Sequence, residues 1–118
     1  MSTQPRLSLA LAYGTAADLG EVMTTMDAAF EPSFGEAWTR SQCGGILVLA
    51  GVWLLLARVD GLPAGFALTR AVADEAELLL LAVSPARRGA GVGRALLDAI
   101  TLACPLVTGE DRLQKATN

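Results

Sequence analysis

The chain has no histidine, and it has few of the residues from which metal sites and disulfide frameworks are built. Without histidine, a Ser–His or Cys–His catalytic triad is excluded. The two cysteines, Cys43 and Cys104, form no C-x-x-C pair, which disfavours a zinc site and favours a reducing compartment. We therefore expect no bound metal and a cytoplasmic protein.

Charged residues and long apolar runs are also scarce. Charged side chains make up 18% of the chain, and the net charge of −3 argues against general binding of nucleic acids, which needs a broad basic face. Gly44–Ala57 is almost wholly apolar, but it is shorter than the roughly 20 residues of a membrane-spanning helix. The first residues lack the apolar core of a secretory signal. We expect neither a membrane span nor a secretory leader.

Apolar residues, by contrast, make up 53% of 118 residues, enough for one domain with a sizeable core. The most informative stretch is Glu77–Leu97. Its first part, Glu77–Val83, is almost wholly apolar and predicts a buried strand. Ser84–Ala90 is a basic turn, and from Gly91 the apolar residues recur at three- and four-residue spacing, which predicts a helix.

This strand–turn–helix unit predicts a binding site for phosphate or pyrophosphate. The amides of a helix's first turn have no internal partner, and the helix dipole adds partial positive charge there. Glycines let an anion approach the backbone closely, and arginine can donate two hydrogen bonds to one phosphate. The residues concerned are Gly89, Gly91, Gly93, Arg87, Arg88 and Arg94. The alternative is a plain corner in which the glycines only make the turn.

The spacing distinguishes three kinds of phosphate site. A P-loop would end in Gly-Lys-Ser/Thr, but here Arg94 follows Gly93. A dinucleotide fold needs G-x-G-x-x-G early in the chain, and Arg94 replaces its third glycine. The V-x-P of Val83–Pro85, followed by the R-x-x-G-x-G of Arg88–Gly93, instead resembles the acetyl-CoA motif of the GNAT superfamily of N-acetyltransferases.

The resemblance implies acetyl-CoA as acetyl donor and assigns its contacts residue by residue. The pantetheine arm would bond to the backbone of Leu81, Ala82 and Val83. The pyrophosphate would be held by Arg88, at the first position of the motif, and by Gly89, Ala90, Gly91, Val92, Gly93 and Arg94. The resemblance also implies a three-layer αβα fold of the α+β class, with a mixed, mostly antiparallel sheet flanked by helices.

The remaining elements fit the same fold. Thr15 and Asp18 form a capping-box-like helix start, and Asp60-Gly61 is a strong hairpin signal. The expected strands are Leu7–Tyr13, Val52–Val59, Ala64–Val72 and Glu77–Val83, and the expected helices are Ala16–Ala29, Glu36–Cys43 (ended by Gly44-Gly45) and Gly91–Ala103. The order β-α-α-β-β-β-α matches the N-terminal two-thirds of a GNAT domain.

The resemblance covers about residues 5–103 of a single domain that spans residues 1–118. The tail, residues 104–118, is atypical: Leu106-Val107 could start a stub of strand, but Thr108–Asn118 is polar and carries no strand signal. The tail also has no tyrosine, the residue that the family uses as general acid. The usual C-terminal strands are therefore expected to be missing, as in a C-terminally truncated domain. The apolar edge that this leaves exposed would favour a homodimer.

Glu77 is the candidate general base. It lies six residues before Val83, the register of the catalytic glutamate in several GNAT enzymes. Strand alternation predicts that residues 77, 79, 81 and 83 share one face. The alternative is an ordinary glutamate at a strand end. Trp38 and Phe34 could line an acceptor groove or belong to the core, and the only tyrosine, Tyr13, is predicted to be structural.

The predicted function is therefore an acetyl-CoA-dependent N-acetyltransferase acting directly on an amine. Asp27–Trp38 resembles the first two helices of the ribosomal-protein alanine N-acetyltransferase branch, which implies a protein N-terminal α-amine as acceptor. Two alternatives remain: a non-catalytic remnant that still binds coenzyme A, and a small partner-binding domain that completes its sheet with another chain.

Overall fold

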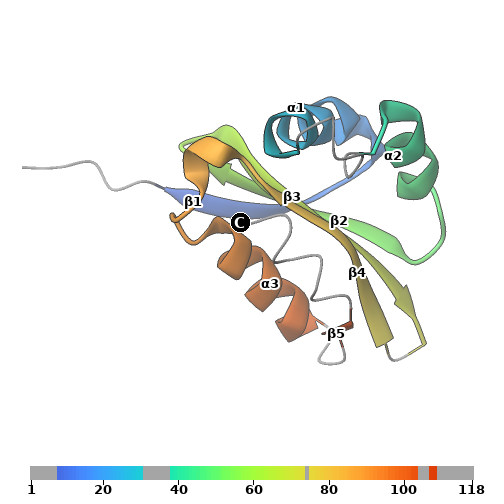
Figure 1. Ribbon diagram of the computed structural model, residues 1–118. Coiled ribbons are helices and arrows are strands. Elements are labelled where there is room, and N and C mark those ends of the chain that lie inside the picture. Colours follow the sequence, from blue (N-terminus) through green and yellow to red (C-terminus); the bar gives the residue numbers. More distant parts are fainter. Residues whose placement is uncertain (1–7, 31–37, 74, 104–106, 109–118) are drawn as a thin grey trace, which may run out of the picture.

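The computed structural model describes residues 8–30, 38–73, 75–103 and 107–108. They form a sheet of five strands in the order β1-β2-β3-β4-β5, with helices packed on both faces (Figure 1). The strands are β1 (Leu9–Gly14), β2 (Val52–Val59), β3 (Leu62–Val72), β4 (Glu75–Val83) and β5 (Val107–Thr108). The helices are α1 (Leu19–Ala29), α2 (Arg40–Leu47) and α3 (Val92–Ala103).

The layers confirm the predicted fold class. Strands β1 to β4 pair antiparallel with their neighbours, and β5 pairs parallel with β4. Helices α1 and α2 lie over one face of the sheet, and α3 lies over the other (Figure 1). The predicted order β-α-α-β-β-β-α is present and is followed by the short β5. Within the described residues, no helix has the length and apolarity needed to cross a membrane.

The core lies on both faces of β3, the strand between β2 and β4. Phe66 and Leu68 of this strand have no exposed surface. Helix α1 buries Val22 and Met26 against one face, and α3 buries the stripe that its spacing predicted. That stripe consists of Val92, Leu96, Leu97 and Ile100. Because both faces of the central strands are covered, their sequences are nearly continuous apolar runs.

An ion pair joins α1 to the sheet near the start of that helix. The guanidinium of Arg58, on β2, donates from Nε and Nη2 to the carboxylate of Glu21, with an Nη2–Oε1 distance of 3.0 Å. Hydrogen bonding and charge attraction from Glu21 raise the pKa of Arg58 above its ordinary value. The pair therefore links the first turn of α1 to β2, while the body of the helix packs against β3 and β4.

The second helix differs from its prediction. Helix α2 runs from Arg40 to Leu47 and contains Gly44 and Gly45, which were expected to end it. Thr39 and Gln42 begin it with a reciprocal capping box, in which each backbone amide donates to the other residue's side chain at 2.8 and 3.1 Å. Cys43 anchors it in the core, which offsets the roughly 1 kcal/mol that each glycine costs. The first residues of the predicted helix, 36 and 37, lie outside the described residues.

Gly51, directly before β2, has a left-handed backbone conformation and no room for a side chain. Its φ is +80°, and a Cβ there would lie 2.5 Å from the carbonyl oxygen of Ala71. We expect Gly51→Ala to lower the free energy of unfolding by about 3 kcal/mol, because left-handed strain adds to a clash with backbone. Gly61→Ala is the matched control, since Gly61 has φ +81° and open space around it, and should cost only about 1 kcal/mol. Urea denaturation measures both, and equal losses would contradict this explanation.

Candidate functional site

The glycine-rich turn, residues 84–91, joins β4 to α3 through backbone that only glycine adopts easily. It begins with a 3₁₀ turn at Pro85–Arg87 and then bends through Gly89 and Gly91, whose φ values are +85° and +82°. A Cβ on either glycine would meet no protein atom within 4 Å. The two glycines therefore leave an open space in front of the turn that the described protein atoms do not fill.

The first amides of α3 are available beside this space. Ala95 N donates to Gly91 O at 2.9 Å, the first hydrogen bond of the helix ladder. The amides of Val92, Gly93 and Arg94 precede that bond and have no intrahelical acceptor. Within the described part of the chain, these three amides donate no hydrogen bond to another segment. Together with the helix dipole, they can bind an anion.

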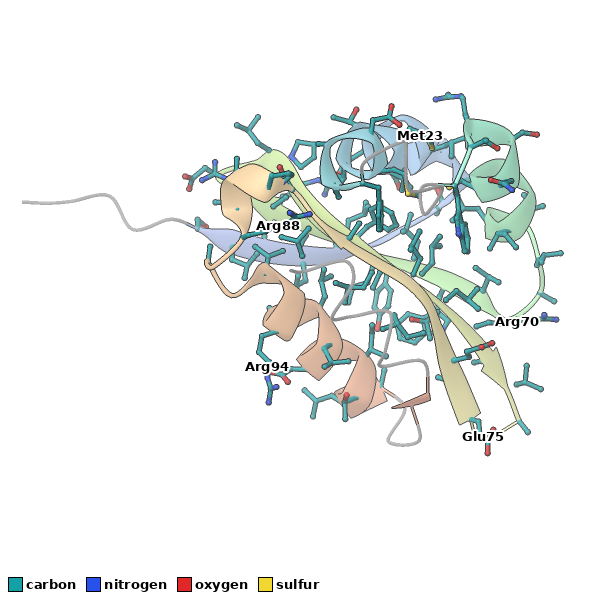
Figure 2. The ribbon with its side chains drawn as sticks, in the orientation of Figure 1. Met23, Arg70, Glu75, Arg88 and Arg94 are labelled. Carbon is teal, nitrogen blue, oxygen red and sulfur yellow. The ribbon has the colours of Figure 1, made fainter. Side chains whose placement is uncertain are left out.

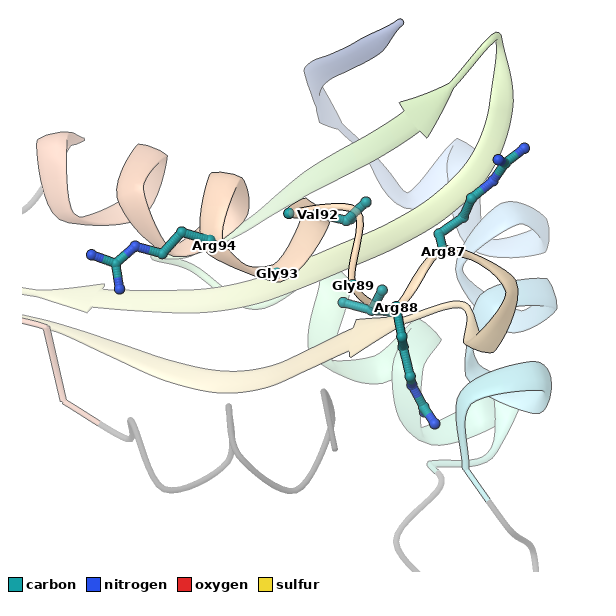
Figure 3. A pocket seen from close by; sticks show the side chains of 8 residues that line it. Arg87, Arg88, Gly89, Val92, Gly93 and Arg94 are labelled. Atoms are coloured by element: carbon teal, nitrogen blue, oxygen red, sulfur yellow. The ribbon is translucent and has the colours of Figure 1, made fainter. Parts of the chain in front are cut away.

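A pocket of about 320 Å³, called here the phosphate pocket, opens at this point (Figure 3). It combines the end of β4 with the turn and the first residues of α3. Its lining residues are Val83, Arg87, Arg88, Gly89, Gly91, Val92, Gly93 and Arg94. Of the residues that the motif matched to the pyrophosphate, the structure brings together all but Ala90, which lies in the turn without lining the pocket.

The three arginines of the phosphate pocket point in different directions (Figure 3). Arg88 extends to the end of α1, where its Nη2 donates to the carbonyl oxygen of Ala29 at 2.9 Å, and its Nε is buried without a partner. Arg94 is largely exposed and pairs with Asp98, one turn on, at 3.2 Å. The guanidinium of Arg88 thus fastens the turn to α1, whereas that of Arg94 lies along α3 beside Asp98.

This arrangement predicts different roles for Arg88 and Arg94. Arg88→Met should lower the free energy of unfolding by about 1–2 kcal/mol, because the Ala29 carbonyl loses a charged donor. Arg94→Met should change stability by less than about 0.5 kcal/mol, because its ion pair is exposed, but should weaken acetyl-CoA binding about tenfold. Urea denaturation and calorimetric titration measure the two effects. If Arg88→Met kept full stability and lost affinity as Arg94→Met does, the assignment would be wrong.

Next to the phosphate pocket, strand β4 pairs with a described strand on one of its two edges only. On that edge, Leu81, Ala82 and Val83 are opposite Ala67, Phe66 and Gly65 of β3. Among the described residues, β5 pairs with β4 only at Ala76 and Glu77, near the far end of the strand. The other edge at residues 81–83, to which the motif assigns the pantetheine arm, is therefore not covered by a described strand.

An irregularity in β4 overturns the predicted alternation of its side chains. Leu68 is opposite Leu80 but Thr69 is opposite Leu78, so Leu79 is an extra residue in a β-bulge. Directly opposite residues share a face, and the bulge places Glu77 on the face of Leu80 and Ala82. The prediction that residues 77, 79, 81 and 83 share one face is wrong. Nothing in the run of leucines indicated the bulge.

Glu77 lies exposed at the far end of β4. A Cβ on Gly65 of β3 would meet side chains of α3, so by alternation Arg70 and its partner Glu77 face the other side of the sheet, that of α1 and α2. Glu77 lines a second pocket, of about 290 Å³, called here the hairpin pocket. The other lining residues are Arg70 and Val72 of β3 and Glu75 of β4, and Figure 2 labels Arg70 and Glu75. Residue 77 is directly opposite Arg70 in the β-ladder.

Tyr13, one of the aromatic candidates, lies away from Glu77 on the sheet. Tyr13 is 71% exposed on β1, separated from β4 by two strands, and its ring is 6.0 Å from that of Trp53. Trp38 packs partly against the core and lines a pocket of about 330 Å³ with residues of α2. Phe34 lies outside the described residues. The structure thus places no tyrosine near the glutamate within its described part.

Fold and site together define a class: an αβα domain in which a glycine-rich turn and the open first turn of a helix follow the fourth strand. Residues 50–117 match the family model of the acetyltransferase (GNAT) domain, and the chain belongs to this family. No curated protein sequence gives a significant match.

Solved structures share the fold. The ribosomal-protein-S18-alanine N-acetyltransferase of Escherichia coli superposes with a TM-score of 0.73 and 24% identity, over 81% of this chain and 59% of that one. The ribosomal-protein-alanine N-acetyltransferase of Brucella melitensis biovar Abortus 2308 superposes with a TM-score of 0.66 and 18% identity, over 86% of this chain and 78% of that one. The PaiA N-acetyltransferase of Thermoplasma acidophilum, in complex with coenzyme A, superposes with a TM-score of 0.68 and 18% identity, over 81% of this chain and 71% of that one. The chain thus spans 59% of the length of the Escherichia coli enzyme.

Proposed function

We propose that this domain transfers an acetyl group from acetyl-CoA to an amine in the cytoplasm, with a protein N-terminal α-amine as the acceptor. The observation that carries the proposal is the phosphate pocket, where open glycine backbone and unpaired helix amides meet. Membership of the GNAT family and the likeness to a structure holding coenzyme A support the donor. The two ribosomal-protein-alanine N-acetyltransferases among the similar structures support the acceptor.

The phosphate pocket fits the diphosphate of acetyl-CoA. The amides of Val92, Gly93 and Arg94 supply donors, and Gly89 and Gly91 leave the room that two phosphate groups need. Arg87 and Arg94 add full positive charge at the rim. When bound, acetyl-CoA supplies an acyl group that its thioester activates for transfer.

The acceptor amine must lose a proton before it can attack, and Glu77 is the residue proposed to take it. Attack is direct, without an acyl-enzyme. The chain has no histidine to activate a serine or cysteine, and burial raises the pKa of the Cys43 thiol, which disfavours the nucleophilic thiolate.

Two measurements on the purified chain test the proposal. Calorimetric titration with acetyl-CoA should show one binding site, and mass spectrometry should find acetylated N-termini in a mixed peptide library. Binding without an acetylated product would favour the remnant that only binds coenzyme A. Absence of binding would contradict the proposal and favour a partner-binding domain.

A further inference from the structure

The hairpin pocket holds three charged side chains at the end of β4 opposite to the glycine-rich turn (Figures 1 and 2). Arg70 and Glu77 are directly opposite in the antiparallel ladder, and Val72 and Glu75 form the next pair on the same face. The Cβ atoms of directly opposite residues are about 5 Å apart. The pocket therefore presents a guanidinium and a carboxylate side by side, with a second carboxylate two residues away.

No ion pair joins these charges in the part of the chain that the structure describes. Opposite charges facing each other across a sheet usually pair. In the described part of the chain, however, both ion pairs lie elsewhere, and none joins Arg70 to Glu75 or Glu77. All three side chains are exposed. A ligand with complementary charges can therefore bind them without breaking an existing interaction.

We propose that the hairpin pocket binds the acceptor, and that the acceptor carries a carboxylate beside its reacting amine. This inference rests on the proposed function, because it takes Glu77 to be the group that receives the amine proton. Glu77 binds the ammonium, and the planar guanidinium of Arg70 binds the carboxylate through two parallel hydrogen bonds. Glu75 keeps the pocket negative overall, which favours a cationic amine over a ligand that is only an anion.

The length of β4 places this pocket at the reactive end of the donor. From Val83, beside the phosphate pocket, to Glu77 the strand extends six residues, or about 20 Å. A donor held at its diphosphate and extended along the β4 edge therefore points its acyl end toward Glu77. The short β5 meets β4 at Ala76 and Glu77, which closes that edge at the same position.

The required chemistry has two sources: a peptide whose first residue is acidic, which keeps the protein N-terminal acceptor proposed above, or a free α-amino acid, which would replace that acceptor and keep the transfer from acetyl-CoA to an amine. Steady-state assays distinguish them with matched pairs, alanine against alaninamide, and a peptide beginning with Glu against one beginning with Gln. The wild type should prefer the carboxylate-bearing member of at least one pair about tenfold in kcat/KM, and the pair that shows the preference identifies the source.

Arg70→Ala should abolish this preference. It should raise KM about tenfold for the carboxylate-bearing acceptor and leave kcat/KM for its neutral counterpart unchanged. Arg40→Ala is the matched control, an exposed arginine at the start of α2, and should change neither. In NMR titrations without donor, the Arg70 side-chain Nε–H should shift with the preferred acceptor and not with its neutral counterpart.

Each outcome decides the inference. The inference would be supported if the wild type preferred the carboxylate-bearing acceptor and Arg70→Ala lost this preference. The inference would be overturned if neutral and carboxylate-bearing acceptors were acetylated at equal rates and Arg70→Ala changed neither rate. That result would not contradict the proposed function. Loss of both activities in Arg70→Ala would indicate general damage and would also overturn the inference. Absence of acetylation of any amine by the wild type would overturn the proposed function and the inference together.

Discussion

Replacing Gly91 with glutamate should lower the affinity for acetyl-CoA at least about a hundredfold, or about 3 kcal/mol. The residue lies in the glycine-rich turn with φ +82° and open space where its Cβ would be. A glutamate side chain there would fill the phosphate pocket and place a negative charge against the diphosphate. Left-handed strain adds about 1–2 kcal/mol of destabilisation. Calorimetric titration with acetyl-CoA measures the loss.

Two control variants separate charge and bulk from backbone strain. Gly61→Glu introduces the same side chain at φ +81° in the β2–β3 hairpin, with open space around it, at a residue that does not line the phosphate pocket. It should lose similar stability and keep wild-type affinity. Gly91→Ala carries the strain without the charge and should show an intermediate loss. If Gly91→Glu bound acetyl-CoA as tightly as Gly61→Glu does, the turn would not be the diphosphate site.

Glu77→Gln should lower kcat by roughly 10²–10³-fold, the usual contribution of a positioned general base. Glutamine keeps the size and polarity of the side chain but cannot accept the amine proton. The residue is exposed on the sheet surface, so the fold should be unaffected. Steady-state kinetics with a preferred peptide measures the change, and the affinity for acetyl-CoA should stay within about twofold.

Asp27→Asn is the matched control for Glu77→Gln, since Asp27 is an exposed acidic residue on α1. It should retain wild-type kcat. The pH dependence of kcat/KM should differ from that of the wild type in Glu77→Gln and match it in Asp27→Asn, because only the first variant loses the base. A wild-type kcat in Glu77→Gln would show that another group or water accepts the proton.

The parts of the fold that the sequence predicted well depend on short-range signals. The bounds of β2, Val52–Val59, match the structure. Asp60 and Gly61 adopt the two positive φ values of the expected tight hairpin turn, 53° and 81°. The capping box of Thr15 and Asp18 is present in the structure. In each case, two to eight neighbouring residues contain the whole signal.

The features that the sequence could not predict depend on contacts between distant segments. The bulge at Leu79 arises from pairing with β3, and a run of leucines looks the same with or without it. The direction of Arg88 depends on Ala29, which is 59 residues away. Helix α2 continues through two glycines because the burial of Cys43 in the core offsets their cost. The pairing of Arg70 with Glu77 likewise depends on the register between β3 and β4, which the sequence alone does not give.

The central claim is that the first amides of α3 and the glycine-rich turn bind the diphosphate of acetyl-CoA. A titration of the ¹⁵N-labelled chain with coenzyme A, followed by two-dimensional NMR, tests it most directly. We predict large saturating shifts for the amides of Gly91, Val92, Gly93 and Arg94, and none for Gly61. Binding that left these four amides unshifted, or no binding at millimolar coenzyme A, would contradict the claim.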